Sequence, residues 1–172
     1  MTAAVAGDVK IRDAKDADLA AIVAIYNIAV ATRISTAQLE QVTVEERRNW
    51  IREHSPDRPF WVAEVDGEVA AWLTIKPFIP RCAYHGTVEL SVYVGDKFRR
   101  RGLGRTLLRE AIAQGSSLGI SAMVGLIFAH NEASLKLFEQ VGFQRWGLLP
   151  RVAVLDGVER DLAILGRHVT KS

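Results

Sequence analysis

The sequence predicts an α/β fold in which a mixed sheet carries helices on its faces. Two Asp-Gly pairs, beginning at Asp66 and Asp156, each lie between strand-like runs and are typical of type I′ hairpin turns. Strand-like and helical patterns also follow one another along the chain in the order β-α-α-β-β-β-α-β-α-β-β. The 172 residues, 49% hydrophobic and 24% charged, are enough for one domain with a buried core.

The first half of the chain is expected to form a strand, two helices and a hairpin. A flexible tail over residues 1–9 precedes a short strand at residues 10–12, and Asp13 is the candidate N-cap of the first helix. The apolar residues of that helix recur at helical spacing: Leu19, Ile22, Val23, Tyr26 and Val30. Thr43 to Glu46 matches a capping box, which predicts a second helix up to about residue 53.

The second half is expected to alternate strands with two helices. One helix follows Gly104 and ends near Gly119, and a shorter one is capped by Asn131 and ends near Gly142. The strands predicted across the hairpins and this half are residues 60–65, 68–75, 87–94, 120–128, 143–148, 152–155 and 159–165. Together these elements predict a single domain over residues 10–168.

Composition argues against several classes of protein. A net charge of +2 gives no reason to expect a nucleic-acid partner. Cys82 is the only cysteine and the four histidines lack ligand spacing, so neither a disulfide nor a metal site is expected. No apolar stretch approaches the ~18 residues that a membrane helix needs, and no signal-peptide pattern opens the chain. These observations favour a cytoplasmic protein with no membrane contact.

A glycine-rich turn, Arg99-Arg100-Arg101-Gly102-Leu103-Gly104, lies between the strand at 87–94 and a helix. The unpaired amides and the positive dipole end of a helix N-terminus attract anions such as phosphate. Two glycines let phosphate oxygens approach the main chain, and the arginines add positive charge. The turn lacks the third glycine of a dinucleotide-binding fingerprint and the Gly-Lys-Ser/Thr of a P-loop.

Arg99, Gly102 and Gly104 form an Arg-x-x-Gly-x-Gly sequence that resembles the signature of the Gcn5-related N-acetyltransferase superfamily. The segment from Asn131 to Phe143 is similar to the next motif of that superfamily. The string Thr-Val-Glu-Leu-Ser-Val-Tyr-Val at 87–94 narrows the resemblance to its phosphinothricin or methionine sulfoximine acetyltransferase group. The resemblance covers residues 11–165 and implies a central, mostly antiparallel twisted sheet, flanked by helices and splayed at the cofactor site.

The resemblance implies acetyl-coenzyme A as the acetyl donor. Its pyrophosphate is expected on main-chain amides of the glycine-rich turn, and its pantetheine arm along the edge of the strand that ends at Val94. The cofactor-binding residues expected on this basis are Val92, Tyr93, Val94, Arg99, Arg100, Arg101, Gly102, Leu103, Gly104, Arg105, Asn131 and Ser134.

The resemblance further implies that the acceptor is the primary amine of a small amino-acid analogue. Because such an amine is mostly protonated at neutral pH, a base must remove a proton, and Glu89 matches the glutamate of the group. Arg81 is the candidate contact for a carboxylate or phosphinate, although a plain surface cation is an equal alternative. The expected acceptor-binding residues are Ile79, Pro80, Arg81, Glu89, Leu90 and Ser91.

Phe138 departs from the pattern, because many relatives carry Tyr or His at this position and Phe has no proton to donate. Either no general acid is used, or Tyr84, Tyr93 or a water molecule serves. A protein or peptide N-acetyltransferase and a non-catalytic acyl-coenzyme A-binding module remain as alternative functions; Glu89 argues against the module and Phe138 for it. Members of the group are commonly homodimers, so a homodimer with the acceptor pocket near its interface is expected.

Overall fold

The computed structural model describes residues 8–170, in which seven strands form one sheet in the order β1-β2-β3-β4-β5-β7-β6. The elements are β1 (Val9–Asp13), α1 (Leu19–Thr32), β2 (Phe60–Val65), β3 (Glu68–Pro77), β4 (Thr87–Val94), α2 (Leu103–Gln114), β5 (Ala122–Phe128), α3 (Glu132–Gln140), β6 (Gln144–Leu155) and β7 (Val158–His168). Every neighbouring pair is antiparallel except β4 and β5. This arrangement confirms the predicted α/β fold with its mostly antiparallel sheet. The tail expected at 1–9 lies outside the described residues except for Asp8 and Val9, and Val9 already belongs to β1.

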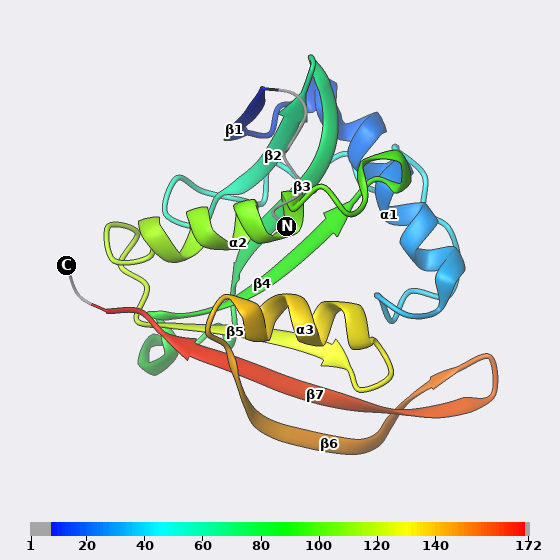
Figure 1. Cartoon of the computed structure of the whole chain (residues 1–172), viewed down its shortest axis with the longest axis vertical. Helices are drawn as coiled ribbons and strands as arrows, with labels where there is room; N and C mark the ends of the chain where they lie inside the picture. Colours follow the sequence, from blue (N-terminus) through cyan, green and yellow to red (C-terminus); the bar gives the residue numbers. More distant parts are fainter. Residues whose placement is uncertain (1–7, 171–172) are drawn as a thin grey trace.

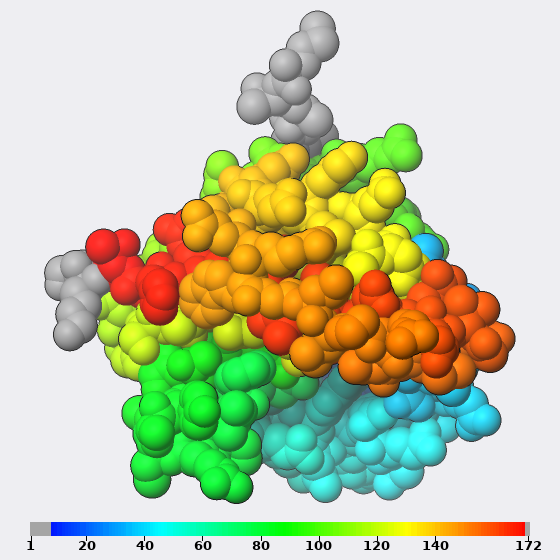
Figure 2. Space-filling model, turned by 90° about the horizontal axis from the view of Figure 1, so that it is seen from below, coloured from blue at the N-terminus to red at the C-terminus, as the bar shows by residue number. Residues whose placement is uncertain are grey.

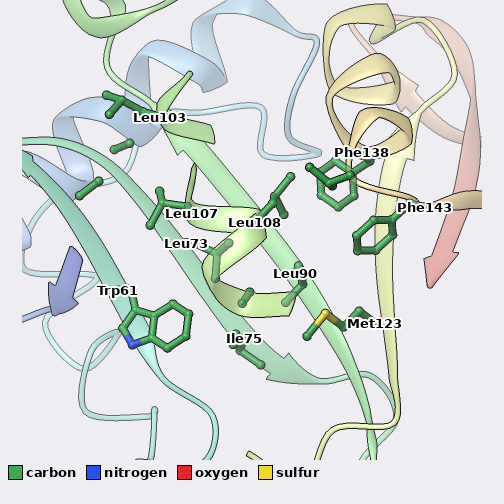
Figure 3. Packing of buried hydrophobic residues seen from close by; sticks show 14 of the residues in the cluster. Trp61, Leu73, Ile75, Leu90, Leu103, Leu107, Leu108, Met123, Phe138 and Phe143 are labelled. Carbon is green, nitrogen blue, oxygen red and sulfur yellow. The ribbon is translucent and has the colours of Figure 1, made fainter. Parts of the chain in front are cut away.

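Helices cover the sheet on both faces, and α2 and α3 lie together on the same face (Figure 1). Successive side chains of β3 point to opposite faces of the sheet and so belong to two separate parts of the core. Leu73 and Ile75 pack toward α2, whereas Trp72 packs toward α1. On the α2 side, Leu107 and Leu108 pack between the helix and the sheet (Figure 3). The sheet is therefore held between two separate apolar layers.

Both Asp-Gly pairs form the expected turns. Asp66 and Gly67 have φ angles of 51° and 81°, and Asp156 and Gly157 have φ angles of 49° and 79°. Positive φ at both central residues defines the type I′ turn, whose twist matches that of the flanking strands. The pairs join β2 to β3 and β6 to β7, so both predicted hairpins are confirmed.

The parallel pair β4 and β5 separates after three residues. Thr87, Val88 and Glu89 pair with the first residues of β5, and within the described residues no ladder pair joins the two strands beyond Glu89. β3 stays paired with β4 as far as Val94, so only the β5 side of β4 is opened. Figure 1 shows the two arrows diverging toward their carboxyl ends. The predicted splay of the sheet is thereby confirmed.

The predicted second helix is wrong, since residues 44–53 form a series of turns. The capping box itself forms: the amide of Thr43 donates to Glu46 Oε2 at 2.7 Å, and the amide of Glu46 donates to Thr43 Oγ1 at 3.2 Å. The amides that follow bond to carbonyls three residues back more often than four, as Trp50 does to Arg47. A cap without a regular i to i−4 ladder does not make an α-helix.

Two element boundaries also differ from prediction. α1 begins at Leu19 rather than after Asp13, because Asp18 closes a 3-10 turn and forms an ion pair with Arg12 at 2.7 Å. β6 is one strand rather than two, and its pairing with β7 shifts between Leu149 and Ala153. The interruption in the sequence pattern is therefore a bulge within a continuous strand.

Phe138 of α3 occupies a core position against β5. Its side chain is 3% exposed and meets the ring of Phe143 edge-on, with centroids 4.9 Å apart (Figure 3). A Cβ atom on Gly125 of β5 would lie 2.6 Å from the Phe138 ring. The ring therefore fills space that a glycine leaves open, which accounts for Phe138 as a packing residue.

Changing Gly125 to Ala is expected to lower the free energy of unfolding by about 1–3 kcal/mol, because the added methyl group overpacks the Phe138 ring. Denaturant titration of both proteins measures the change. Gly147→Ala on β6 is the matched control, since its Cβ would meet Ile164 at an ordinary 3.6 Å. Equal stability of the two variants would contradict this account of the packing.

Candidate functional site

Two cavities adjoin where β4 and β5 separate. The larger, of about 680 Å³, extends from the glycine-rich turn along the opened edge of β4 and is called the cleft cavity. The smaller, of about 380 Å³, contains Glu89 and is called the Glu89 cavity. Ser35 and Tyr93 belong to the walls of both, so the cleft leads directly to the carboxylate.

The cleft cavity gathers residues from α1, β4, α2 and α3 and from the loops beside them. β4 supplies one wall, the start of α3 supplies the opposite wall, and the glycine-rich turn closes one end. Of the twelve residues expected to bind the cofactor, eleven line this cavity: Val92, Tyr93, Val94, Arg99, Arg100, Gly102, Leu103, Gly104, Arg105, Asn131 and Ser134. The structure thus assembles them at one place, although 42 positions separate Val92 from Ser134.

The turn presents main-chain donors at the start of α2. Gly102 is the N-cap residue with a φ of 76°, a conformation that glycine adopts without strain. It has no side chain to cap the helix, so the first amides of α2 have no intrahelical acceptor. Main-chain N–H groups beside guanidinium groups are the donor set that suits a pyrophosphate, so this end of the cleft fits coenzyme A.

The arginines of the turn differ in placement. Arg99 lines the cleft and lies 2.9 Å from Asp96, while Arg105 donates to Gln140 on α3 at 2.6 Å. Arg100 also lines the cleft, and its positive φ of 62° marks the sharp bend of the turn. Arg101 is not part of the wall; its guanidinium carbon lies 5.5 Å from the centroid of the Phe98 ring. The expected role of Arg101 is therefore not supported by its position.

Asn131 closes the opposite wall as the N-cap of α3. Its Oδ1 accepts a hydrogen bond from the Ser134 amide at 3.2 Å, which confirms the predicted cap. The residue is 6% exposed, so its orientation is fixed. The cap and a contact with a bound molecule are compatible, because Oδ1 holds the helix while the amide NH₂ remains a donor.

Three cross-strand pairs of β3 and β4 line the Glu89 cavity. In register, Trp72 faces Tyr93, Thr74 faces Ser91, and Lys76 faces Glu89. All six line the cavity because alternate residues of a strand share a face. The other walls are largely apolar: Tyr26, Trp50, Leu126, Phe128, Val152, Ala153 and Leu162. Aromatic rings thus surround a small set of polar groups.

Two titratable groups in the wall are shifted toward their neutral forms. Burial is the largest cause that raises the pKa of Tyr93, whose hydroxyl donates to the Ser35 carbonyl at 3.4 Å. Burial likewise is the largest cause that lowers the pKa of His54. His54 Nδ1 lies 2.8 Å from the Arg58 carbonyl, which can only accept, so Nδ1 carries the proton. Both groups therefore present uncharged surface to the cavity.

The structure brings only part of the expected acceptor set to the cavity. Glu89 and Ser91 line it, but Leu90 points to the opposite face of β4 and is 3% exposed in the core. Ile79, Pro80 and Arg81 belong to neither cavity wall, because the chain leaves β3 after Pro77 and forms an exposed turn. Tyr84 lies on the same turn, 42% exposed. The position of Arg81 thus gives no support to its expected role.

Sequence reasoning missed the contribution of β3 and of the loop after α1. Thr74 and Lys76 line the Glu89 cavity, and residues 34–37 lie along both cavities. The sequence did signal β3 itself, through its alternating side chains and the type I′ turn at Asp66. The register of β3 against β4 was also needed to place Thr74 and Lys76 in the same cavity as Glu89. The loop carries no periodic pattern that marks it as part of a site.

The described part of the chain contains no group of three or more His, Cys, Asp or Glu side chains placed to hold a metal ion. None of its helices combines the length and the apolar character needed to cross a bilayer.

Comparisons with known proteins agree on one family. Residues 22–143 match the model of the acetyltransferase (GNAT) family. The Bacillus subtilis protein named "Putative phosphinothricin acetyltransferase YwnH" is 46% identical over 93% of this chain and 99% of its own length. The L-methionine sulfoximine/L-methionine sulfone acetyltransferase of Pseudomonas aeruginosa is 36% identical over 90% of this chain and 91% of its own.

A solved structure supports the same relationship. The phosphinothricin acetyltransferase of Sinorhizobium meliloti in complex with acetyl-coenzyme A superposes with a TM-score of 0.85. It is 28% identical, and the match covers 98% of this chain and 89% of that chain.

Arg100 and Arg101 provide a test of which arginines face the cleft. Arg100→Ala is expected to weaken the binding of coenzyme A about fivefold, on the scale of ~1 kcal/mol for an exposed charge contact. Arg101→Ala, its neighbour outside the wall, is expected to bind as the unchanged protein does. Titration calorimetry measures both dissociation constants, and equal losses in the two variants would contradict the assignment.

Proposed function

The chain belongs to the acetyltransferase (GNAT) family, and on that premise we propose that it acetylates the primary amine of a small amino-acid-like acceptor of the phosphinothricin or methionine sulfoximine type. One observation carries the proposal: the cleft that fits coenzyme A leads directly into a cavity whose wall contains the carboxylate of Glu89. An acetyl-coenzyme A-dependent N-acetyltransferase needs these two sites to meet.

Acetyl-coenzyme A supplies the acetyl group as a reactive thioester. The chain binds the donor through its own groups: amides of the turn at Gly102 and the start of α2 for the pyrophosphate, with Arg99 and Arg100 adding charge. The main chain of β4 near Val92 has no strand partner on its β5 side, so its polar groups are available to the pantetheine amides.

Glu89 is the proposed proton acceptor. The acceptor amine, with a reference pKa near ~8, must lose a proton before it attacks. Within residues 8–170 the Glu89 carboxylate forms no ion pair, so no internal cation competes for it. It lies in the wall of the acceptor cavity and is half-buried, where it takes the proton directly or through a water molecule.

No side-chain general acid is part of this proposal. Phe138 is a core residue, and Tyr84 lies outside both cavities. Tyr93 reaches both cavities, but the raised pKa that burial gives it makes the phenol a weaker acid. A thiol with a pKa near ~8.5 leaves with little help, so the absence of an acid is chemically acceptable.

The Glu89 cavity favours a small acceptor. Its volume of about 380 Å³ lies near the lower end of the range for small-molecule sites. Aromatic walls at Tyr26, Trp50 and Trp72 suit the apolar part of an amino-acid side chain. A peptide acceptor needs room for the residues after the first, whereas a cavity of this volume suits a molecule the size of one amino acid.

A homodimer is also part of the proposal. The edge strand β6 and the start of β7 expose large apolar side chains: Trp146, Leu148, Leu149, Val152, Val154 and Val158. In Figure 2 this hairpin, coloured orange to red, lies across the face of the molecule. An exposed apolar edge strand is a surface that proteins normally cover, and a second copy of the chain is the proposed cover. Val152 also lines the Glu89 cavity, so that cover would adjoin the acceptor.

We further propose that residues 10–168 act as one domain in the cytoplasm. One sheet runs through this whole range, from β1 to β7. The thiol of Cys82 is exposed and free, which suits a reducing compartment.

Changing Glu89 to Gln is expected to lower kcat with L-methionine sulfoximine about 100-fold at neutral pH, because the amide cannot accept the proton. Coenzyme A affinity is expected to stay the same. Thiol release and calorimetry measure the two quantities, with the exposed Glu139→Gln on α3 as the control. Unchanged turnover of the Glu89 variant would remove this residue as the base.

Replacing Val154 and Val158 together by Asp is expected to convert a dimer into a 19.0 kDa monomer, because two charges would enter the apolar interface. Light scattering after size exclusion gives the mass. Val44→Asp, which changes an exposed valine outside the β6–β7 hairpin, should leave the dimer intact. A monomeric parent protein would show that the second copy is not the cover.

A further inference from the structure

Residues 34–37, the loop that follows α1, contribute to the walls of both cavities. Ile34 and Ser35 line the cleft cavity, and residues 35–37 line the Glu89 cavity. Ile34 is the one large apolar side chain of this loop and is 41% exposed, so apolar packing does little to hold the loop. Its place is therefore set mainly by polar contacts.

Arg33 makes the bend between α1 and this loop, and three contacts hold it. Its φ of 58° lies in the left-handed region, which is unfavourable for a residue with a Cβ atom. The Arg33 guanidinium donates to the Val30 carbonyl at 2.9 Å and pairs with Asp156 on the β6–β7 turn at 2.6 Å. The Arg33 carbonyl accepts a hydrogen bond from His130 Nε2 at 3.1 Å. These contacts fix the direction in which the chain enters the loop.

The hydrogen bond from His130 ties the loop to a well-anchored part of the fold. The ion pair is a weaker tether, because the Asp156 side chain is 62% exposed and exposed pairs stabilise proteins little. His130 lies in the short connection between β5 and α3. There the Asn131 amide donates to the Phe128 carbonyl at 2.9 Å, and the Asn131 side chain caps α3. The donor of the bond is thus held firmly in place.

Packing alone does not account for a histidine at position 130. The ring stacks on Phe128 with centroids 5.5 Å apart, a contact that a phenylalanine would also make. Because the Arg33 carbonyl can only accept, Nε2 carries a proton, whereas Nδ1 is buried and has no partner within residues 8–170. A buried polar atom without a partner lowers stability, and phenylalanine would avoid that penalty. The histidine is therefore best explained by the hydrogen bond that Nε2 donates.

We propose that His130 is a positioning residue for acetyl transfer, which acts through the Arg33 carbonyl on the loop at 34–37. This role rests on the proposed function and adds to it a residue that belongs to neither cavity wall. Transfer requires the amine and the thioester to be aligned, and a loop that borders both cavities sets how the two meet. Coenzyme A has a second anchor at the glycine-rich turn, so loss of the His130 bond affects the acceptor more than the cofactor.

The test compares His130→Phe, which keeps a ring but removes the donor, with His130→Gln, which keeps an N–H donor at a similar reach. L-methionine sulfoximine is the acceptor, at saturating acetyl-coenzyme A. His130→Phe is expected to raise KM about tenfold, on the scale of one hydrogen bond, and to lower kcat. His130→Gln is expected to restore both values. The dissociation constant of coenzyme A, measured by calorimetry, should stay that of the parent in both variants.

Asp156→Asn separates the two tethers of Arg33. Asn-Gly suits a type I′ turn as well as Asp-Gly does, so the hairpin stays intact while the ion pair is lost. Because that pair is exposed, KM for the acceptor is expected to change by less than about twofold. The melting temperatures of all three variants without ligands should stay close to that of the parent.

Several results would overturn the positioning role. One is an unchanged KM in His130→Phe, and another is a failure of His130→Gln to restore it. A His130→Phe protein that unfolds or melts far below the parent would show a structural role instead. A larger effect of Asp156→Asn than of His130→Phe would assign the position of the loop to the ion pair. All of these leave the proposed function intact, whereas a parent protein that binds coenzyme A but acetylates no small amine in a panel would contradict that function.

Discussion

The site depends on the early end of the pairing between β4 and β5. If the two parallel strands stayed in register, main-chain hydrogen bonds would occupy the edge of β4 and no cavity would lie beside it. Their separation after Glu89 leaves main-chain groups that need partners, and a molecule with two amides is a suitable one. α2 and α3 stabilise the opening from one face, where a Cβ on Gly104 would lie only 3.0 Å from Leu137. The unpaired edge is thus a stable part of the fold rather than a defect in it.

Local signals explain why much of the fold was predictable. The Asp66-Gly67 turn, the strand 87–94 and the Asn131 cap each depend on a few consecutive residues, and each forms as expected. The failure at Thr43 is also local, because a capping box satisfies the first amides without ensuring that the following residues propagate a helix. Sequence patterns therefore indicate ends of elements better than they indicate what lies between them.

The residues of the candidate site likewise differ in whether a contiguous sequence motif marks them. Gly102 and Glu89 lie in contiguous motifs, so the sequence alone could name them as candidates, and both line the adjoining cavities. Thr74 could not be named in this way, because its place in the wall of the Glu89 cavity follows from its pairing with Ser91, which only the register of β3 on β4 reveals. Arg81 shows the converse case: its chemistry suits an anion, but it lies on an exposed turn outside the walls of both cavities. Residue type without position is weak evidence for a binding role.

The indole rings of Trp50 and Trp72 form part of the wall of the Glu89 cavity, with centroids 5.5 Å apart. Indole emission responds to the polarity and the hydration of its surroundings. Trp50 is half-buried, so entry of a small molecule changes the hydration of its ring, whereas Trp72 is 1% exposed and Trp61 is buried in the layer under α2. Trp50 thereby gives the chain an intrinsic optical reporter of occupancy of the Glu89 cavity, and entry of a small molecule can be followed by fluorescence without attaching any label.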